Sequence, residues 1–216
     1  MIKINIQYSV QNEIERVFST INRIDSFIER GYNIEKLSFP QNIPYNEFKS
    51  MTKDEIEKLI IGEYKVDDYE KNIKYIQDEW LKMEPKLSTG IEKMKIVPTA
   101  EFDIIFTKYG ITGSYHNPKT ILVNIEKLHS EELLKSILHE SIHLIINPYI
   151  LTYKIEHWPK ERITDLIFLD FFSELNKMQS IPNMDKLDKI FYKYFPNIEA
   201  VISKISGLSN INNIES

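Results

Sequence analysis

The sequence SEELLKSILHESIHLII, residues 130–146, combines a helical start with a segment, residues 137–145, in which no charge other than that of Glu140 interrupts the Ile and Leu residues. Two glutamates lie in its first turn, where acidic side chains stabilise the positive end of a helix dipole. His139, Glu140 and His143 follow among Ile and Leu residues, and such groups are costly to bury unless they are paired or bound to a metal. The stretch therefore predicts a buried helix that carries a polar site and ends before Pro148.

The spacing of these three polar side chains is that of a zinc site. Residues four apart project from the same helix face, so His139 and His143 can offer two imidazole nitrogens to one ion. Glu140 lies about 100° round the helix, beside the open position of such an ion, where a carboxylate can take a proton from an activated water. The chain contains no cysteine, so the expected Zn2+ must be held by His and carboxylate ligands.

A second acidic pair supplies candidates for the third ligand. Glu161 lies early in the next predicted helix, which begins at a proline, and Asp165 is one turn further on the same face. This spacing favours Glu161 as the ligand and Asp165 as the acceptor of a ligand histidine's second N–H. Three other carboxylates are within reach by chain length: Glu156, Asp170 and Glu174.

This arrangement resembles the gluzincins, the thermolysin-like branch of the zincin metallopeptidases. Their helix motif HExxH is followed on a second helix by Glu-x-x-x-Asp, and the matching residues here are His139, Glu140 and His143, then Glu161 and Asp165. The resemblance implies a zincin-like fold, a bound zinc ion and peptide-bond hydrolysis. In this reaction Glu140 would be the general base and later the proton donor to the leaving amine.

The resemblance covers residues 100–175 and does not extend to the residues before them. Lys160 stands where thermolysin-like sequences often have Asn. The metzincin branch, which places a third histidine six residues after the second, is excluded because that position is Tyr149. In zincins an edge strand borders the cleft and pairs with an extended substrate, and by order along the chain residues 110–115 would be that strand.

The donor that stabilises the oxyanion is expected from a loop between the two helices. Gluzincins use Tyr or His near the site for this purpose, and Tyr153 and His157 are the candidates here, with Tyr149 beside them. The chain has 12 tyrosines, so a loop tyrosine can equally be a packing residue. His116 and His129 are interpreted as a turn residue and a helix-entry residue.

Three segments before the motif are typical of strands. Residues 102–107 and 120–125 are rich in β-branched and aromatic side chains, and residues 110–115 form a short segment punctuated by glycine. The turn chemistry of residues 116–119 would join the last two segments as an antiparallel hairpin. We therefore expect an α+β fold of the zincin type, with a small mixed or antiparallel sheet whose edge strand lies beside the active-site helix.

The first half of the chain predicts a mainly helical lobe. Residues 2–8 alternate with period 2, as in a strand, and apolar residues then recur at helical spacing from Ile14 to Ile28. The further expectations are a surface loop over residues 32–50, a short helix opened by a capping box of Thr52 and Glu55, and a helix from Tyr69 that ends before Pro85. The lobe would span residues 1–95, the catalytic core with its C-terminal helices residues 96–208, and a fraying polar tail residues 209–216.

The composition limits the kinds of partner that the protein is expected to bind. The net charge is −5 and the basic residues are interleaved with acidic ones, so nucleic acid is not an expected partner. No apolar run approaches the length of a membrane span, and the N-terminus lacks the apolar core of a signal peptide, so the sequence as written predicts a cytoplasmic protein. Removal of a leader from an exported protein would leave the same sequence.

The expected function is zinc-dependent hydrolysis of a peptide or protein substrate. Two alternatives stay open. One is a catalytically silent zincin-like domain that binds metal or a protein partner as a regulator. The other is a metal-dependent hydrolase of a non-peptide amide.

Overall fold

The computed structural model describes residues 1–97, 99–175 and 181–212. It shows a mixed α/β fold in which most residues are helical. The strands are β1 (Lys3–Gln7), β2 (Glu101–Thr107), β3 (Gly113–His116) and β4 (Thr120–Asn124). The α-helices are α1 (Val10–Ile21), α2 (Ile24–Glu29), α3 (Tyr45–Phe48), α4 (Lys53–Glu63), α5 (Val66–Lys93), α6 (Ser130–Thr152), α7 (His157–Phe171), α8 (Asp185–Tyr194) and α9 (Ile198–Asn212). Short 3-10 turns are η1 (Ile34–Lys36), η2 (Pro40–Asn42) and η3 (Ser173–Leu175).

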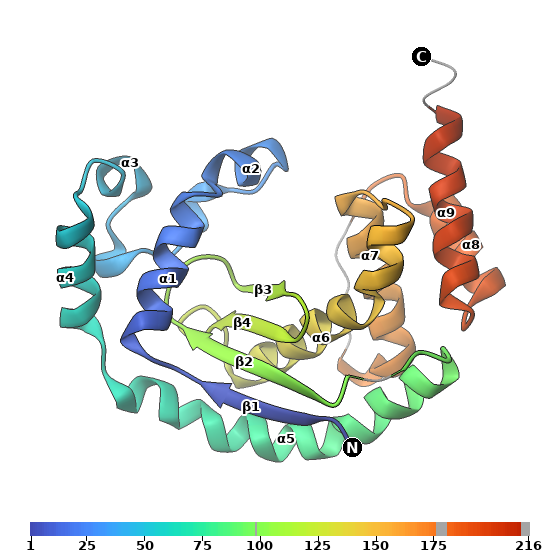
Figure 1. Cartoon of the computed structure of the whole chain (residues 1–216), viewed down its shortest axis with the longest axis horizontal. Coiled ribbons are helices and arrows are strands. Elements are labelled where there is room, and N and C mark those ends of the chain that lie inside the picture. Colours follow the sequence, from blue (N-terminus) through green and yellow to red (C-terminus); the bar gives the residue numbers. More distant parts are fainter. Residues whose placement is uncertain (98, 176–180, 213–216) are drawn as a thin grey trace.

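The strands form one mixed sheet in the order β1-β2-β4-β3 (Figure 1). β1 pairs in parallel with β2, and β2 pairs in parallel with β4. β3 pairs antiparallel with β4, with Gly113 opposite Val123 and His116 opposite Thr120, so the predicted hairpin is confirmed. β3 is thus an outer strand of this sheet, and α6 packs against β3 and β4.

The main apolar core joins the sheet to helices α5 to α9. Phe102, Ile104 and Phe106 alternate along β2 and are fully buried, as expected for one face of a strand. They belong to one apolar cluster with residues of α5, α6, α7, α8 and α9. The N-terminal strand is tied to α5 because the Trp80 indole N–H donates to the Ile2 carbonyl at 3.0 Å. β1 and α5, from the first 95 residues, thus pack with the segment that carries the motif.

The prediction that the helix from Tyr69 ends before Pro85 is wrong: α5 continues to Lys93 with Pro85 inside it. Proline lacks the amide hydrogen that would bond to the Leu81 carbonyl. Leu81 is 63% exposed, so water can hydrate this region of the helix. The buried residues Leu87 and Ile91 continue the apolar face beyond the proline, and their packing favours the longer helix.

The motif helix also runs past its predicted end. α6 includes Pro148 and continues to Thr152, because Ile150 in its last turn is buried in the main core. The expected loop of residues 147–158 is therefore reduced to a short connection. α7 begins at His157 rather than at the proline two residues later, which occupies the first turn, where no amide hydrogen is needed.

Residues 10–63 form a second apolar cluster beside the sheet. The single helix expected from Ile14 to Ile28 is two helices, α1 and α2, and the expected loop over residues 32–50 contains η1, η2 and α3. The capping box at Thr52 is confirmed: its hydroxyl accepts from the Glu55 N–H, and the Glu55 carboxylate accepts from the Thr52 N–H. The second cluster brings together α1 to α4 and places them over one end of the sheet (Figure 1).

At the other end of the chain, the expected C-terminal helices are present as α8 and α9. The backbone of residues 209–212 continues α9, and residues 213–216 of the expected tail lie outside the described residues. Among the described helices, none has the length and apolar character needed to span a bilayer.

Candidate metal centre

Two ligands come from the middle of α6. His139 and His143 are one turn apart and are 4% and 2% exposed. Their Nε2 atoms lie 3.1 Å from each other, so both imidazoles aim the same nitrogen at one point. Helical spacing sets this pair, and aromatic rings lie against it: Tyr115 stacks on His143 with 5.1 Å between the ring centroids, and Phe168 lies 6.5 Å from His139.

The third ligand atom comes from α7, which packs against α6. Glu161 Oε2 lies 3.2 Å from His143 Nε2 and 3.5 Å from His139 Nε2. Ligand atoms bound at the usual distances to a tetrahedral zinc ion are about 3.3 Å apart, which matches this triangle. The buried group of His139, His143 and Glu161 could therefore bind a metal ion.

Neighbours on α7 orient both imidazoles. The Thr164 hydroxyl lies 3.0 Å from His143 Nδ1 and donates to the Lys160 carbonyl, so it can accept the Nδ1–H of His143. Asp165 Oδ1 lies 3.5 Å from His139 Nδ1, and Asp165 is fully buried. An acceptor at each Nδ1 leaves the Nε2 lone pair directed at the ligand triangle.

The electrostatics also suit a cation. Burial by itself would raise the pKa of Glu161, but hydrogen bonds with His139 and His143 and the nearby Lys160 outweigh it and hold the pKa far below its usual range. Burial lowers the pKa of His143, more than the carboxylate of Glu161 raises it. A carboxylate kept ionised beside a neutral imidazole is the protonation state that metal binding requires.

Glu140 lies at the wall of a cleft beside the triangle. A Cβ atom added at Gly113 of β3 would lie 2.8 Å from Glu140 Oε1 and 2.6 Å from the Ser136 hydroxyl. The glycine thus lets the backbone of the outer strand pass directly over this carboxylate. The cleft has a volume of about 350 Å³ and is lined by Tyr32, Asn33, Lys36, Leu37, Ile111, Thr112, Gly113, Lys127, Ser136, His139, Glu140 and Glu161.

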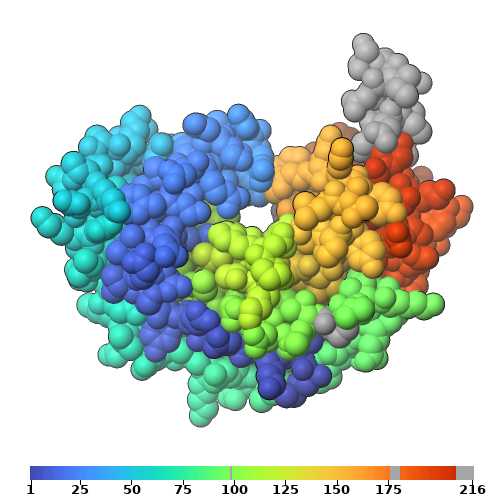
Figure 2. All heavy atoms as spheres, in the orientation of Figure 1, coloured from blue at the N-terminus to red at the C-terminus, as the bar shows by residue number. Residues whose placement is uncertain are grey.

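Figure 2 shows a hollow between the N-terminal segments in blue and the α7 region in orange. Tyr32, which follows α2, bridges it. Its hydroxyl lies 3.1 Å from His157 Nε2, and its ring stacks on Trp158 with 6.3 Å between the ring centroids. His157 Nδ1 is 3.6 Å from Glu161 Oε1, so His157 stands beside the ligand triangle.

The other candidates from the sequence lie elsewhere. The Tyr153 hydroxyl donates to Glu199 at 3.0 Å, and Tyr153 is not among the residues that line the cleft. Asp170 and Glu174 form ion pairs with lysines of α5, and Glu156 is the residue before the first turn of α7. Among the described carboxylates, Glu161 is the one that joins the two histidines.

Three contributors, Thr164, Tyr32 and Arg16, were not among the site residues predicted from the sequence. Thr164 could have been suspected, because it is one turn beyond Glu161 on the same helix. Tyr32 is 125 residues from its partner His157. Arg16 of α1 is buried and donates to the Ser114 hydroxyl at 2.8 Å and to the Ile111 carbonyl at 2.9 Å, which holds the start of β3 in place.

Comparison with protein-family models, curated proteins and solved structures finds no match to this chain.

Proposed function

We propose that this protein is a zinc-dependent peptidase of the gluzincin type. The observation that carries the proposal is the near-equilateral triangle of His139 Nε2, His143 Nε2 and Glu161 Oε2, with Glu140 beside it in an open cleft. Three protein ligands with a vacant fourth direction are typical of catalytic zinc sites, whereas structural sites use four.

Zinc held by these three atoms would lower the pKa of a water molecule and polarise the substrate carbonyl. In this proposal Glu140 would accept the proton of that water and pass it to the leaving amine. Its carboxylate lies under the backbone of Gly113, so a peptide bond held along β3 would be within its reach.

The outer edge of β3 offers a binding surface for the peptide. β3 is the last strand of the sheet order, and β4 pairs with its other edge. An extended peptide can add to such an edge through main-chain hydrogen bonds. Arg16 keeps the register of this edge relative to Glu140, because it binds both Ser114 and Ile111.

His157 and Tyr32 are the candidate donors to the oxyanion. They contact each other over the cleft, and Tyr32 lines it. Burial raises the pKa of the Tyr32 hydroxyl, and Glu161 raises it further, so the hydroxyl keeps its proton at neutral pH. A positioned neutral donor of this kind stabilises developing negative charge. Tyr32→Phe should lower kcat by roughly tenfold to a hundredfold.

The test pairs the wild type with Glu140→Gln. Both proteins should bind one zinc ion per chain, measured by mass spectrometry of the metal, and the wild type alone should cleave peptides in a diverse pool. Zinc in both proteins with cleavage by neither would favour the silent regulator. Cleavage of amides other than peptides would favour the second alternative, and absence of zinc binding would remove the proposal altogether.

A further inference from the structure

Lys127 stands out among the residues that line the cleft. It follows β4, is half-buried, and donates from Nζ to the backbone carbonyl of Lys36, which lines the same cleft. Among the described residues, no ion pair links Lys127 or Lys36 to an acidic side chain. Lys127 and Lys36 thus both line the cleft, and neither has a described ion pair with a carboxylate.

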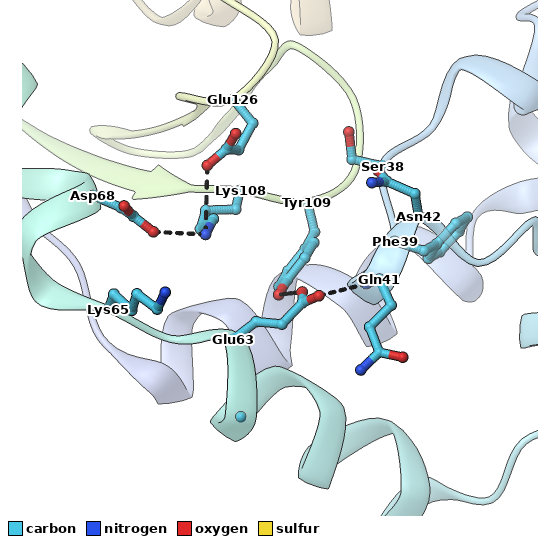
Figure 3. Close-up of a pocket in the computed structure, with 11 residues that line it drawn as sticks. Ser38, Phe39, Gln41, Asn42, Glu63, Lys65, Asp68, Lys108, Tyr109 and Glu126 are labelled. Carbon is cyan, nitrogen blue, oxygen red and sulfur yellow. Dashed lines mark hydrogen bonds and ion pairs between the residues drawn. The ribbon is translucent and has the colours of Figure 1, made fainter.

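Other partly buried lysines of this protein are paired. Figure 3 shows a second polar pocket, in which Lys108 bonds to Asp68 at 2.8 Å and lies 3.4 Å from Glu126. Lys135 has two glutamates as partners in the same way. In the pocket of Figure 3 the lysine is ion-paired with two carboxylates, whereas no described ion pair joins Lys127 to a carboxylate.

The pKa values of Lys108 and Lys127 are also shifted in opposite directions. The hydrogen bonds with Asp68 and Glu126 outweigh burial and raise the pKa of Lys108. Burial lowers the pKa of Lys127, and the positive charge of Arg16 lowers it further. An ammonium group that is partly removed from water beside a second cation is stabilised most by an incoming anion.

The position of Lys127 indicates on which side of the cleaved bond this anion would lie. Gly113 lies over Glu140, and Ile111 and Thr112, which precede it in the chain, line the same cleft as Lys127. The Thr112 carbonyl accepts from the N–H of Asn124, and the Asn124 side chain accepts from the Lys127 N–H, so this wall lies beside Lys127. A peptide that pairs antiparallel with β3 runs from His116 towards Gly113, so the residues after its scissile bond continue towards Lys127. At about 3.3 Å per residue, the first few residues after the cleaved bond would reach it.

We propose that Lys127, assisted by Lys36, binds a carboxylate of the substrate on the C-terminal side of the cleaved bond. This inference rests on the proposed peptidase function. The carboxylate can be an Asp or Glu side chain, or the C-terminal carboxylate of a short peptide. The site therefore selects substrates with negative charge after the cleaved bond, while Glu140 and Glu161 at the metal centre repel such charge from the reacting position.

The test uses three pools of random nonapeptides and the zinc-loaded protein. The pools are peptides with Asp and Glu and an amidated C-terminus, peptides without acidic residues and with a free C-terminus, and peptides with neither carboxylate. The wild type should cleave one or both carboxylate pools at least about tenfold faster than the neutral pool. Sequencing of the products should place Asp or Glu after the cleaved bond, or the cleavage sites near the free C-terminus.

Substitution of the lysine should remove this preference. Lys127→Met should cleave all three pools at rates similar to one another, with unchanged zinc content, and Lys127→Arg should retain most of the preference. Lys74→Met, at an exposed position of α5, is the matched control and should behave as the wild type. A preference that survives in Lys127→Met, or acidic residues enriched before the cleaved bond, would overturn the proposal.

A binding arm separates this inference from the peptidase function. The three pools are passed over immobilised Glu140→Gln protein, which keeps Lys127 but should not turn over substrate. Retention of the carboxylate pools, lost with Glu140→Gln/Lys127→Met, supports the anion site even if the wild type cleaves nothing. Equal retention of all pools refutes the anion site even if the wild type is an active peptidase.

Discussion

Two buried glutamates, Glu161 and Glu13, have pKa values that are shifted in opposite directions. Glu161 is 8% exposed and its pKa is held far below the usual range by imidazoles and a lysine. Glu13 of α1 is 1% exposed, and burial raises its pKa to about 7, although the Tyr69 hydroxyl and the Lys108 backbone N–H donate to it. Burial is therefore not what distinguishes a metal site in this protein.

The difference lies in what converges on each carboxylate. Glu161 meets two imidazole nitrogens that can give a lone pair to a cation. Glu13 meets two donors, from α5 and from the end of β2, so it can join these elements but offers a metal a single ligand residue. The cluster around Glu161 is suited to bind an ion, and the cluster around Glu13 is suited to hold the N-terminal helices on the sheet.

The largest expected effect comes from removing a ligand. His143→Ala should weaken zinc binding by more than about a hundredfold, because it leaves two protein ligands. A saturating excess of zinc should raise the Tm of the wild type by roughly 5–10 °C and leave that of His143→Ala unchanged. Calorimetry of the wild type and of His143→Ala, with and without zinc, measures the zinc affinity and the Tm. His116→Ala, at the exposed end of β3, and Glu13→Gln should keep the Tm increase with zinc. If either variant lost this increase, the metal response would not be specific to the cluster around Glu161.

The next effect concerns the stability of the cluster around Glu13. A raised pKa in the folded state means that the folded protein binds more protons than the unfolded chain. The contribution of Glu13 to the free energy of unfolding is therefore fully present below pH 4.5 and is lost as the pH rises to about 7. The loss attributable to this group is about 3 kcal/mol. Glu13→Gln should remove this pH dependence, and urea unfolding between pH 4.5 and 8 measures it. Glu15→Gln, exposed on the same helix, should follow the wild-type profile; an identical profile for Glu13→Gln would show that Glu13 ionises freely when folded.

A smaller effect is expected from the hydroxyl that orients His143. Thr164→Val keeps the shape of the side chain but removes the acceptor of the Nδ1–H. Zinc affinity should fall by about tenfold to a hundredfold, measured by competition with a chelator. Thr152→Val is a matched control, because the Thr152 hydroxyl makes the same helical bond to the carbonyl four residues earlier, that of Pro148, at an exposed position. Equal affinities of the two variants would mean that Thr164 does not orient the ligand.

The smallest effect is expected for the donor to Glu13. Tyr69→Phe removes one of its two hydrogen bonds and should lower the free energy of unfolding by about 1 kcal/mol, with the zinc affinity unchanged. Tyr192→Phe, at a position 71% exposed, should change neither quantity. A change in zinc affinity in Tyr69→Phe would show that the two clusters are coupled.

Much of the candidate site could be predicted from helical geometry. The pairing of His139 with His143 depends on a spacing of four residues, and the placement of Asp165 after Glu161 depends on the same spacing. The hairpin of β3 and β4 was also predictable, because turn residues separate two short strand-like segments. Each of these features involves neighbours in the chain.

The errors in the prediction come from packing. The local chemistry of proline predicts that helices end before Pro85 and Pro148, yet α5 and α6 continue through them. The apolar residues beyond each proline are buried in the main core, and this burial outweighs one missing hydrogen bond. Local rules for proline hold only where tertiary contacts do not oppose them.

By itself, the sequence determined that two histidines and a glutamate share one buried helix and that an acidic pair follows on the next. Only the tertiary structure decided that Glu161 joins the histidines, that Tyr32 reaches His157, and that Lys127 faces the same cleft. The physical reason is distance along the chain: backbone periodicity sets the positions of residues a few places apart. Contacts such as Lys127 with Lys36, 91 residues apart, depend on how the whole chain buries its apolar surface.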